Sequence, residues 1–258
     1  SYVDALNIEV ISDELQGSLS ISNSQGNKLQ ITIPDVSNIY KISIIDFAGG
    51  NSTVTINGST SAAFTTTSSS TGEDLYNFLI ADATVGPLIG VGVNIYYSDS
   101  NITIVPIAAT IVAVTVSNSA VLTSVIIVPA NVAPIHPIGY AILRDNIYIF
   151  STTCYNEDPQ TNGGGYGYIW KFSYNNITFL QNNTGTYIPV AANLELIYAN
   201  DLDFTTWYNI PQTGVVTRYE NDLIQRIYWT DNYNKLRSIN VAQDQLFAMD
   251  VSLLDVVP

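Results

Sequence analysis

A series of short apolar–polar alternations, separated by turn residues, places the strongest constraint on the fold. Residues 29–33 alternate and end at Pro34, and residues 40–45 alternate again. This period of two is typical of half-buried β-strands, because successive side chains point to opposite faces of a sheet. Pro34 lacks the N–H that a continuing ladder needs, so it ends the first strand. The sequence therefore predicts a mainly β protein.

Asn57 and Gly58 predict a hairpin in the middle of the chain, because both residue types tolerate a positive φ. We expect the paired strands to be residues 53–56 and 61–67. Four more strands are expected, at residues 91–97, 102–107, 110–116 and 121–128.

One helix is predicted among these strands. Thr71 and Asp74 have the spacing of a capping box, which predicts a helix over residues 72–83. Its apolar face, expected to pack on a sheet, contains Leu75, Phe78 and Leu79. The middle of the chain therefore resembles a small α+β domain.

The last part of the chain is rich in aromatic residues, Asn and Asp, and predicts consecutive hairpins after a linker marked by Pro129, Pro134 and Pro137. The expected strand pairs are residues 138–143 with 147–150, 166–173 with 177–180, and 215–219 with 223–229. A further strand is expected at residues 236–241. Hairpins at this spacing are typical of propeller blades. The predicted fold class is mainly β, with β-propeller-like blades and an inserted small α+β or β-sandwich domain.

These patterns divide the chain into three parts. Residues 1–34 would supply the opening strands of the scaffold, residues 35–133 the inserted domain, and residues 134–258 the propeller-like blades. A blade uses roughly 40 residues, so the two scaffold parts hold about four blades at most. The chain begins without Met, and we expect a processed product or one segment of a larger protein.

Composition excludes several classes of protein. Hydrophobic residues make up 47% and charged residues 12%, so the chain should fold. The net charge is −14, and none of the eight Lys and Arg residues lies between Ile42 and Leu143. A surface that binds nucleic acid needs clustered cations, so specific binding of nucleic acid is not expected. The acidity would either repel DNA from a wall or only keep the protein soluble.

Two further features limit the class. Cys154 is the single cysteine, so the chain has no intrachain disulfide framework. The most apolar stretch, residues 102–135, is broken by Pro106 and Pro129 and lacks the ~18 unbroken apolar residues of a membrane helix. We expect no membrane segment.

No pattern predicts catalysis, and we expect that the protein is not an enzyme. His136 is the single histidine, and it lies in the proline-rich linker without a nucleophile-elbow pattern nearby. Zinc sites use several His or Cys ligands, whereas this chain has His136 and Cys154 alone. We therefore predict no catalytic, cofactor-binding or metal-binding residue, and no cofactor.

Three other stretches contain residue types that occur in binding or catalytic sites. Gly-rich residues 163–167 lack the Lys and the helix of a phosphate loop, so a flexible loop is expected. Glu157 and Asp158 lack the spacing of a calcium loop. Asp201 and Asp203 form a carboxylate pair in an aromatic stretch, which is compatible with a glycosidase or a sugar-binding cleft. The alternative is that the aromatic side chains fill a blade core while the acids cap turns; those side chains are Phe204, Trp207 and Tyr208.

Three stretches carry a family resemblance: residues 1–28, residues 138–170 and residues 227–241. The last reads Tyr-Trp-Thr-Asp-x-x-Asn-x-x-Arg-x-Ile-Asn from Tyr228 to Asn240. The residues that carry the motifs are Tyr2, Asp4, Asn7, Tyr228, Trp229, Thr230, Asp231, Asn234, Arg237 and Asn240. Together these stretches resemble the tail nozzle or muzzle (stabilization) proteins of short-tailed, crAss-like bacteriophages.

The resemblance implies a structural subunit of the virion. Copies would form a homo-oligomeric ring around the tail channel, through which the genome and cargo proteins leave. The implied partners are the tail hub, portal or ring proteins and tail fibres, and the implied location is the phage tail. The alternative is a virion or extracellular propeller module that binds a carbohydrate or receptor. The Tyr-Trp-Thr-Asp run also resembles the blade motif of lipoprotein-receptor propellers, but it occurs once here.

Overall fold

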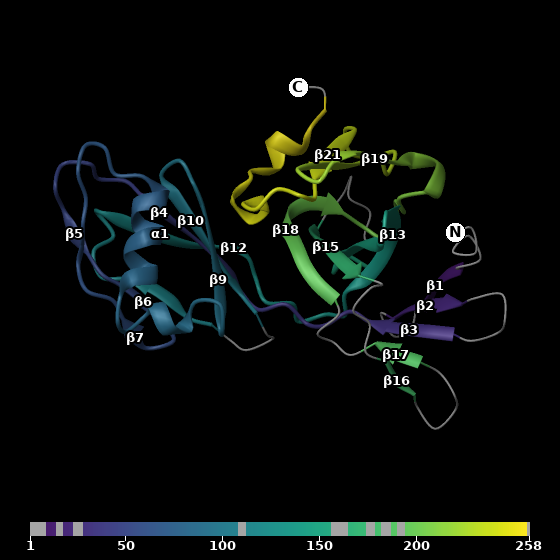
Figure 1. Cartoon of the computed structure of the whole chain (residues 1–258), viewed down its shortest axis with the longest axis horizontal. Helices are drawn as coiled ribbons and strands as arrows, with labels where there is room; N and C mark the ends of the chain where they lie inside the picture. The colour runs from purple at the N-terminus through teal and green to yellow at the C-terminus, as the bar shows by residue number, and fades with distance from the viewer. Residues whose placement is uncertain are drawn as a thin grey trace. The chain divides into compact units, whose positions relative to one another are not determined.

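β-Strands make up most of the secondary structure, as the sequence predicts. The computed structural model describes residues 9–13, 18–22, 28–107, 112–155, 165–173, 179–181, 187–189 and 194–256. Over these ranges the α-helical content is α1 (Gly72–Ala81), and the strands form several small sheets (Figure 1). Among these residues, no helix has the length and apolar character needed to cross a bilayer.

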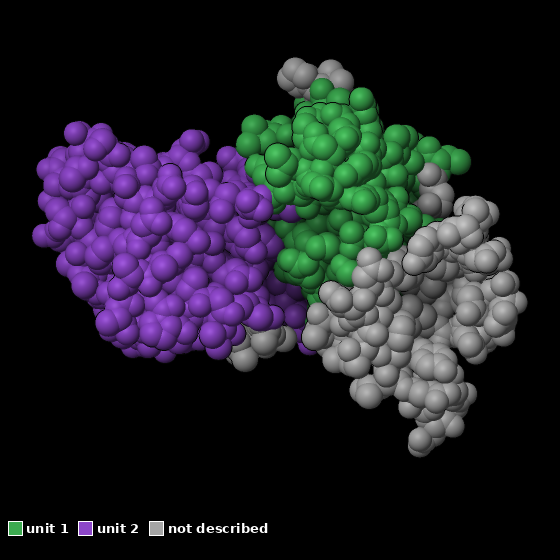
Figure 2. Space-filling model, viewed as in Figure 1, with its two compact units in different colours: residues 1–34, 132–243, 251–258 green, residues 35–131, 244–250 purple. Residues whose placement is uncertain are grey.

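The chain forms two compact units (Figure 2). Unit 1 contains residues Ser1–Pro34, Val132–Gln243 and Val251–Pro258. Unit 2 contains residues Asp35–Asn131 and Asp244–Asp250. Unit 2 is therefore formed by two separate stretches of the chain. No sequence pattern predicts that residues 244–250 belong to it.

A four-stranded antiparallel sheet forms the centre of unit 1. Its strands, in spatial order, are β13 (His136–Leu143), β14 (Asn146–Thr152), β15 (Gly165–Ser173) and β18 (Leu194–Phe204). Successive residues Ile147–Thr152 of β14 are all buried, so both faces of this inner strand are covered. The first expected hairpin, β13–β14, is confirmed.

The linker expected before this hairpin ends earlier than predicted. β13 already begins at His136 and includes Pro137. Proline removes an N–H donor from a ladder, but β13 is an edge strand of its sheet, where that loss is tolerated.

The second expected hairpin, residues 166–173 with 177–180, is wrong. β15 pairs with β14 on one side and with β18 on the other, whereas β16 (Phe179–Gln181) pairs with β17 (Tyr187–Pro189). The physical reason is burial, because two long neighbours let β15 bury Tyr168, Ile169, Trp170 and Phe172.

The glycines that begin β15 are not part of a flexible loop. Residues 165–167 belong to the strand, while residues 163–164 lie outside the described residues. A Cβ atom on Gly167 would lie 2.5 Å from Cδ2 of Phe204 and 2.7 Å from Cβ of Leu202. Glycine at this position therefore lets β18 approach closely.

A three-stranded antiparallel sheet follows in the same unit. It contains β19 (Val215–Asn221), β20 (Ile224–Trp229) and β21 (Arg237–Asn240), preceded by the 3₁₀ turn η4 (Gln212–Gly214). The third expected hairpin and the last expected strand are thus confirmed. β19 lies beside β13, so the edge strands of the two sheets are neighbours.

The remaining sheet of unit 1 combines distant segments. Its order is β1 (Glu9–Asp13), β2 (Ser18–Ser22), β3 (Lys28–Thr32), β17 and β16. β3 and β17 pair in parallel, with Leu29 opposite Tyr187. The turn η6 (Val251–Leu254) is followed by an isolated antiparallel bridge between Asp255 and Arg237.

Unit 2 is built on a four-stranded antiparallel sheet. Its strands, in spatial order, are β12 (Leu122–Val128), β4 (Ile39–Ile44), β10 (Asn101–Pro106) and β9 (Val93–Ser98). α1 packs on β9 and β10 (Figure 1). It buries Leu75 and Leu79 in the core of the unit. The capping box of Thr71 and Asp74 is present as predicted, and the helix ends two residues before the expected boundary.

The turn at Asn57 and Gly58 also forms as predicted, but its return strand differs. β6 (Val54–Ile56) pairs with β7 (Ser59–Thr60) and with β11 (Val114–Val116). β8 (Phe64–Thr65) instead pairs with β5 (Asn51–Ser52). Ser61 separates β7 from β8, because its Oγ accepts from the Val54 N–H at 3.0 Å and takes a donor that a longer ladder would use. The 3₁₀ turn η2 (Gly86–Leu88) lies between α1 and β9.

Candidate functional site

The motif from Tyr228 to Asn240 spans the connection between β20 and β21. Asp231 begins this turn and is 1% exposed. Its Oδ1 accepts hydrogen bonds from the N–H groups of Tyr233 (3.0 Å) and Asn234 (2.7 Å). Asn232 adopts a left-handed φ of 63°, which asparagine tolerates better than most residues. The Thr-Asp pair therefore shapes the turn, since Thr230 Oγ1 also accepts from the Asn232 N–H at 3.3 Å.

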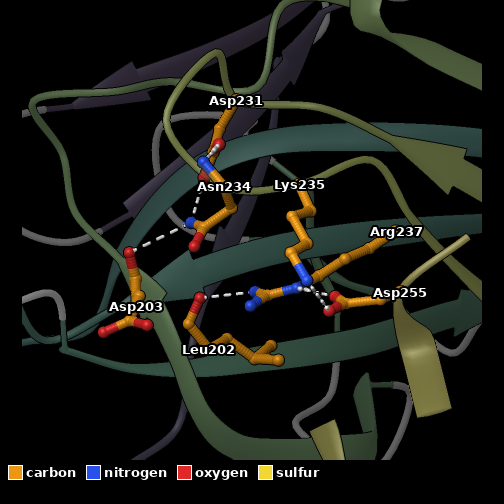
Figure 3. Close-up of polar contacts among 7 residues, drawn as sticks. All are labelled: Leu202, Asp203, Asp231, Asn234, Lys235, Arg237 and Asp255. Atoms are coloured by element: carbon orange, nitrogen blue, oxygen red, sulfur yellow. Dashed lines mark hydrogen bonds and ion pairs between the residues drawn. The ribbon is translucent and has the colours of Figure 1, made fainter. Parts of the chain in front are cut away.

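Asn234 connects this turn to the neighbouring sheet. Its Nδ2 donates to Oδ2 of Asp231 at 2.7 Å and to the backbone carbonyl of Asp203 at 3.3 Å (Figure 3). Asp203 lies near the end of β18 and has a left-handed φ of 53°. Asn234, which Asp231 holds in place, therefore binds the backbone of β18.

Arg237 makes a second connection to β18. Its side chain is buried, and its Nη1 donates to the carbonyl of Leu202 at 2.6 Å. Its Nε donates to Oδ1 of Asp255 at 3.4 Å, while Lys235 pairs with the other oxygen of Asp255 at 3.4 Å (Figure 3). A buried guanidinium is tolerated because it is paired and hydrogen-bonded.

The other motif residues in this stretch support the same sheets. Trp229 is 1% exposed and its ring lies 5.2 Å from that of Phe150 in β14. Asn240 accepts from the N–H of Gln225 at 2.8 Å and donates to the carbonyl of Leu223 at 2.9 Å. Tyr228 lies in β20 and is partly buried.

The motif therefore forms a polar connection between two sheets of unit 1. Seven of its expected residues gather along β20, β21 and the connection between them, and two of them bind successive carbonyls of β18. The other three, Tyr2, Asp4 and Asn7, lie outside the described residues. The sequence did not identify the acceptor positions or Asp255, because a backbone carbonyl carries no side-chain signal.

A second polar connection, which joins two hairpin turns, was not predicted from the sequence. Arg144, which has a left-handed φ of 54°, places its Cζ 4.3 Å from the centre of the Tyr219 ring. Its Nη1 also donates to Asp222 at 3.2 Å, and Tyr219 Oη donates to the same carboxylate oxygen at 2.7 Å. This exposed cluster joins the β13–β14 turn to the β19–β20 turn.

His136 and Cys154 lie on neighbouring segments of unit 1, since His136 is opposite Thr152 and the Cys154 N–H donates to Oγ1 of Thr152 at 3.0 Å. His136 stacks on Tyr155 with a 4.5 Å centroid distance, and burial lowers the pKa of its imidazole. Cys154 is buried. Within the described ranges, no group of three or more His, Cys, Asp or Glu side chains could hold a metal ion. Glu157 and Asp158 lie outside those ranges.

The carboxylate pair of β18 is partly exposed. Desolvation raises the pKa of Asp201, and the neighbouring Asp203 carboxylate raises it further. Phe204 is fully buried, as the core interpretation predicts, whereas Trp207 is 57% exposed. That interpretation is therefore right for Phe204 and wrong for Trp207.

Comparison with known proteins identifies the family. The family described as "Crassvirus muzzle protein" matches residues 1–258. The chain belongs to the crassvirus muzzle protein family. The resemblance stated from the sequence motifs is thereby confirmed.

A curated member of the muzzle family gives a shorter match. The chain is similar to the muzzle protein of Bacteroides phage crAss001, with 36% identity over 74 residues. The matched stretch covers 29% of this chain and 5% of that protein. The relative is therefore several times longer than this chain.

Proposed function

We propose that this chain is a structural subunit of the phage virion that contributes to the muzzle of the tail. The family match over residues 1–258 carries this proposal. Copies would form a ring around the tail channel, through which the genome and cargo proteins leave. The protein would act by shaping this channel, with no catalytic step. Tail hub, portal or ring proteins and tail fibres are the proposed neighbours.

The arrangement of unit 1 supports a propeller-like scaffold. β13, β14, β15 and β18 form a four-stranded antiparallel sheet in simple spatial order, and β19, β20 and β21 form the next one. Propeller blades are small antiparallel sheets whose first strands lie side by side near an axis. The neighbouring positions of β13 and β19 fit that arrangement. We propose further that residues 35–133 are an insertion between the first scaffold segment and the blades.

The polar connections between neighbouring sheets fit a structural role. Arg237 and Asn234 bind the backbone of β18, and Arg144 joins two hairpin turns. Asn234 and Arg237, two residues of the Tyr228–Asn240 motif, thus hold neighbouring sheets together. A virion component must keep its shape while DNA passes, so this use of polar side chains supports a structural subunit.

The charge balance supports a channel that does not retain DNA. Asp and Glu number 22 against eight Lys and Arg. Six of those cations already form ion pairs within the described residues: Lys41, Arg144, Lys171, Arg218, Lys235 and Arg237. Few cations remain for phosphate contacts, so a wall of this protein would repel a polyanion. Acidic side chains that all point away from the lumen would contradict this step.

The test of the ring is the native mass of the purified chain by light scattering, with negative-stain images of the same sample. We expect closed rings of several subunits. A monomer at every concentration tested would contradict self-assembly by this chain. As a control, the double variant Asp145→Asn/Asp244→Asn changes two exposed acids and should assemble as the wild type does.

A further inference from the structure

The two-residue turn between β6 and β7 consists of an asparagine followed by a glycine. Asn57 and Gly58 are both exposed, and both have a positive φ, of 50° and 82°. Ile56 and Ser59 pair on either side of them. An Asn–Gly sequence is chemically reactive, because the backbone nitrogen of the glycine can attack the side-chain carboxamide of the asparagine. A glycine has no Cβ to hinder that approach.

The attacking nitrogen is available in this turn. The hydrogen bonds of the described residues leave the Gly58 N–H without an acceptor. A Cβ built on Gly58 would meet no atom within 4 Å, so this side of the turn is open. The nitrogen and the carboxamide of Asn57 are neighbours in sequence. The reaction is therefore intramolecular, and ring closure needs only local rotation about the bonds of Asn57.

Ala113 provides a donor to the carbonyl that would be attacked. Its N–H donates to Oδ1 of Asn57 at 2.9 Å, and its carbonyl accepts from the Asn57 N–H at 2.9 Å. Attack on Cγ moves negative charge onto Oδ1, and donors that stabilise such an oxyanion lie roughly 2.7–3.1 Å away. Ala113 thus places a donor where this charge develops. Within the described ranges, Nδ2, which would leave as ammonia, has no hydrogen-bond acceptor.

A second asparagine in a turn lacks a free nucleophile. Asn232 is also exposed and has a similar φ of 63°. The next residue is Tyr233, whose side chain hinders the approach of its own backbone nitrogen. The Tyr233 N–H also donates to Oδ1 of Asp231 at 3.0 Å. Exposure and backbone conformation are thus alike at the two asparagines, whereas the attacking nitrogen is free beside Asn57 and occupied beside Asn232.

We infer that Asn57 is a site of spontaneous deamidation that alters the β6–β7 turn. The Gly58 nitrogen forms a bond to Cγ and gives its proton to water, while Nδ2 takes up a proton and leaves as ammonia. Water then opens the cyclic imide at one of its two carbonyls, so the product is aspartate or isoaspartate. Water is the reactant, and no oxidation or reduction takes place.

The two products change unit 2 differently. Aspartate adds one negative charge and keeps an oxygen for the Ala113 N–H. Isoaspartate carries the backbone through the former side chain, which adds one carbon to the turn between the paired residues Ile56 and Ser59. Because Ile56 also pairs with Val114, isoaspartate should loosen β6 from both β7 and β11. This inference is independent of the proposed ring, since the reaction takes place within a single chain.

The first experiment follows the modification in the intact chain by peptide mapping with mass spectrometry, in mildly alkaline buffer. A synthetic peptide of residues 54–60 gives the rate without the fold. We expect Asn57 to be converted in the folded chain by the time the peptide has reacted, and Asn232 to react roughly tenfold more slowly. Unmodified Asn57 after complete reaction of the peptide would overturn the inference. Equal conversion of Asn57 and Asn232 would overturn it as well.

The second experiment tests the nucleophile with a matched pair of variants. Gly58→Ala places a Cβ beside the attacking nitrogen and should slow conversion of Asn57 roughly tenfold. Gly90→Ala is the control, because Gly90 has a φ of 81° and its Cβ would also meet no atom within 4 Å. It has the same backbone strain and should leave the rate at Asn57 unchanged. Equal slowing in both variants would contradict attack by Gly58.

The third experiment tests the effect on the turn by hydrogen exchange. A sample enriched in isoaspartate at Asn57 should exchange faster in β6 and β7 than the fresh chain. Asn57→Asp, which keeps the acceptor for Ala113, should exchange as the fresh chain does. Unchanged exchange in the isoaspartate sample would show that the turn accommodates the added carbon, and would overturn the inferred effect on unit 2.

Discussion

The carboxylate of Asp231 accepts three hydrogen bonds, two from backbone N–H groups and one from the Asn234 side chain. At 1% exposure it has almost no water to replace a lost partner. Hydrogen bonds to a charged acceptor each contribute about 1.5–3 kcal/mol, and an unsatisfied buried donor is costly. Asp231 is therefore expected to be the most sensitive polar residue of the motif.

Asp231→Asn should lower the free energy of unfolding of unit 1 by about 2 kcal/mol, because the new amide would face the amide of Asn234 and lose that bond. Urea unfolding followed by tryptophan emission measures this, since all three tryptophans belong to unit 1. Asp145→Asn, in an exposed turn, is the matched control and should change little. Equal effects of the two variants would show that the turn does not depend on the Asp231 carboxylate.

Burial of two tyrosines predicts a loss of stability at high pH. Burial raises the pKa of Tyr148 and of Tyr168 to about 12 from 10.0. The folded chain therefore keeps protons that the unfolded chain releases, so the stabilisation is present below pH 10 and is lost as the pH rises toward 12. The Tyr148→Phe/Tyr168→Phe variant should lose less stability between pH 9 and 11 in urea unfolding. Parallel losses in variant and wild type would contradict the assignment.

At the scale of elements, the contact between β15 and β18 depends on a missing side chain. Gly167→Ala would place a methyl group 2.5 Å from Phe204, in a fully buried position of the core. We expect a loss of about 1–3 kcal/mol, the usual effect of overpacking. Gly92→Ala meets its nearest atom at 3.6 Å and is the control. Thermal unfolding followed by circular dichroism measures both, and equal melting temperatures would show that β18 can move away without penalty.

Local signals explain which elements were predictable. The β13–β14 and β19–β20 hairpins have a short turn between alternating strands, and α1 has its capping box, so neighbours in sequence are partners in space. The partners of β15 were not predictable, because its place between β14 and β18 is decided by burial across distant segments. The motif residues could likewise be named from the sequence, but not the carbonyls of Leu202 and Asp203 that they bind.

At the scale of the molecule, residues 244–250 form a strap that belongs to unit 2 although both of its flanks belong to unit 1. Phe247, in the turn η5 (Leu246–Ala248), is 3% exposed and lies 5.0 Å from the ring of Tyr96. Gln245 Oε1 accepts from the N–H of Tyr97 at 2.8 Å, on the edge strand β9. The strap thus covers an edge that would otherwise expose unpaired backbone groups.

Removing the strap's anchor should therefore loosen unit 2 and leave the core of unit 1 unchanged. Phe247→Ala removes a buried ring, a change that typically costs 3–5 kcal/mol, and should release Gln245 from β9. Hydrogen exchange measured by mass spectrometry should become faster in β9 and β10, while β14 and β15 exchange as in the wild type. Leu253→Ala, which truncates a side chain that is 67% exposed just beyond the strap, is the control. Unchanged exchange in β9 would mean that the sheet of unit 2 is stable without the strap, and faster exchange in β14 would mean that the two units unfold together.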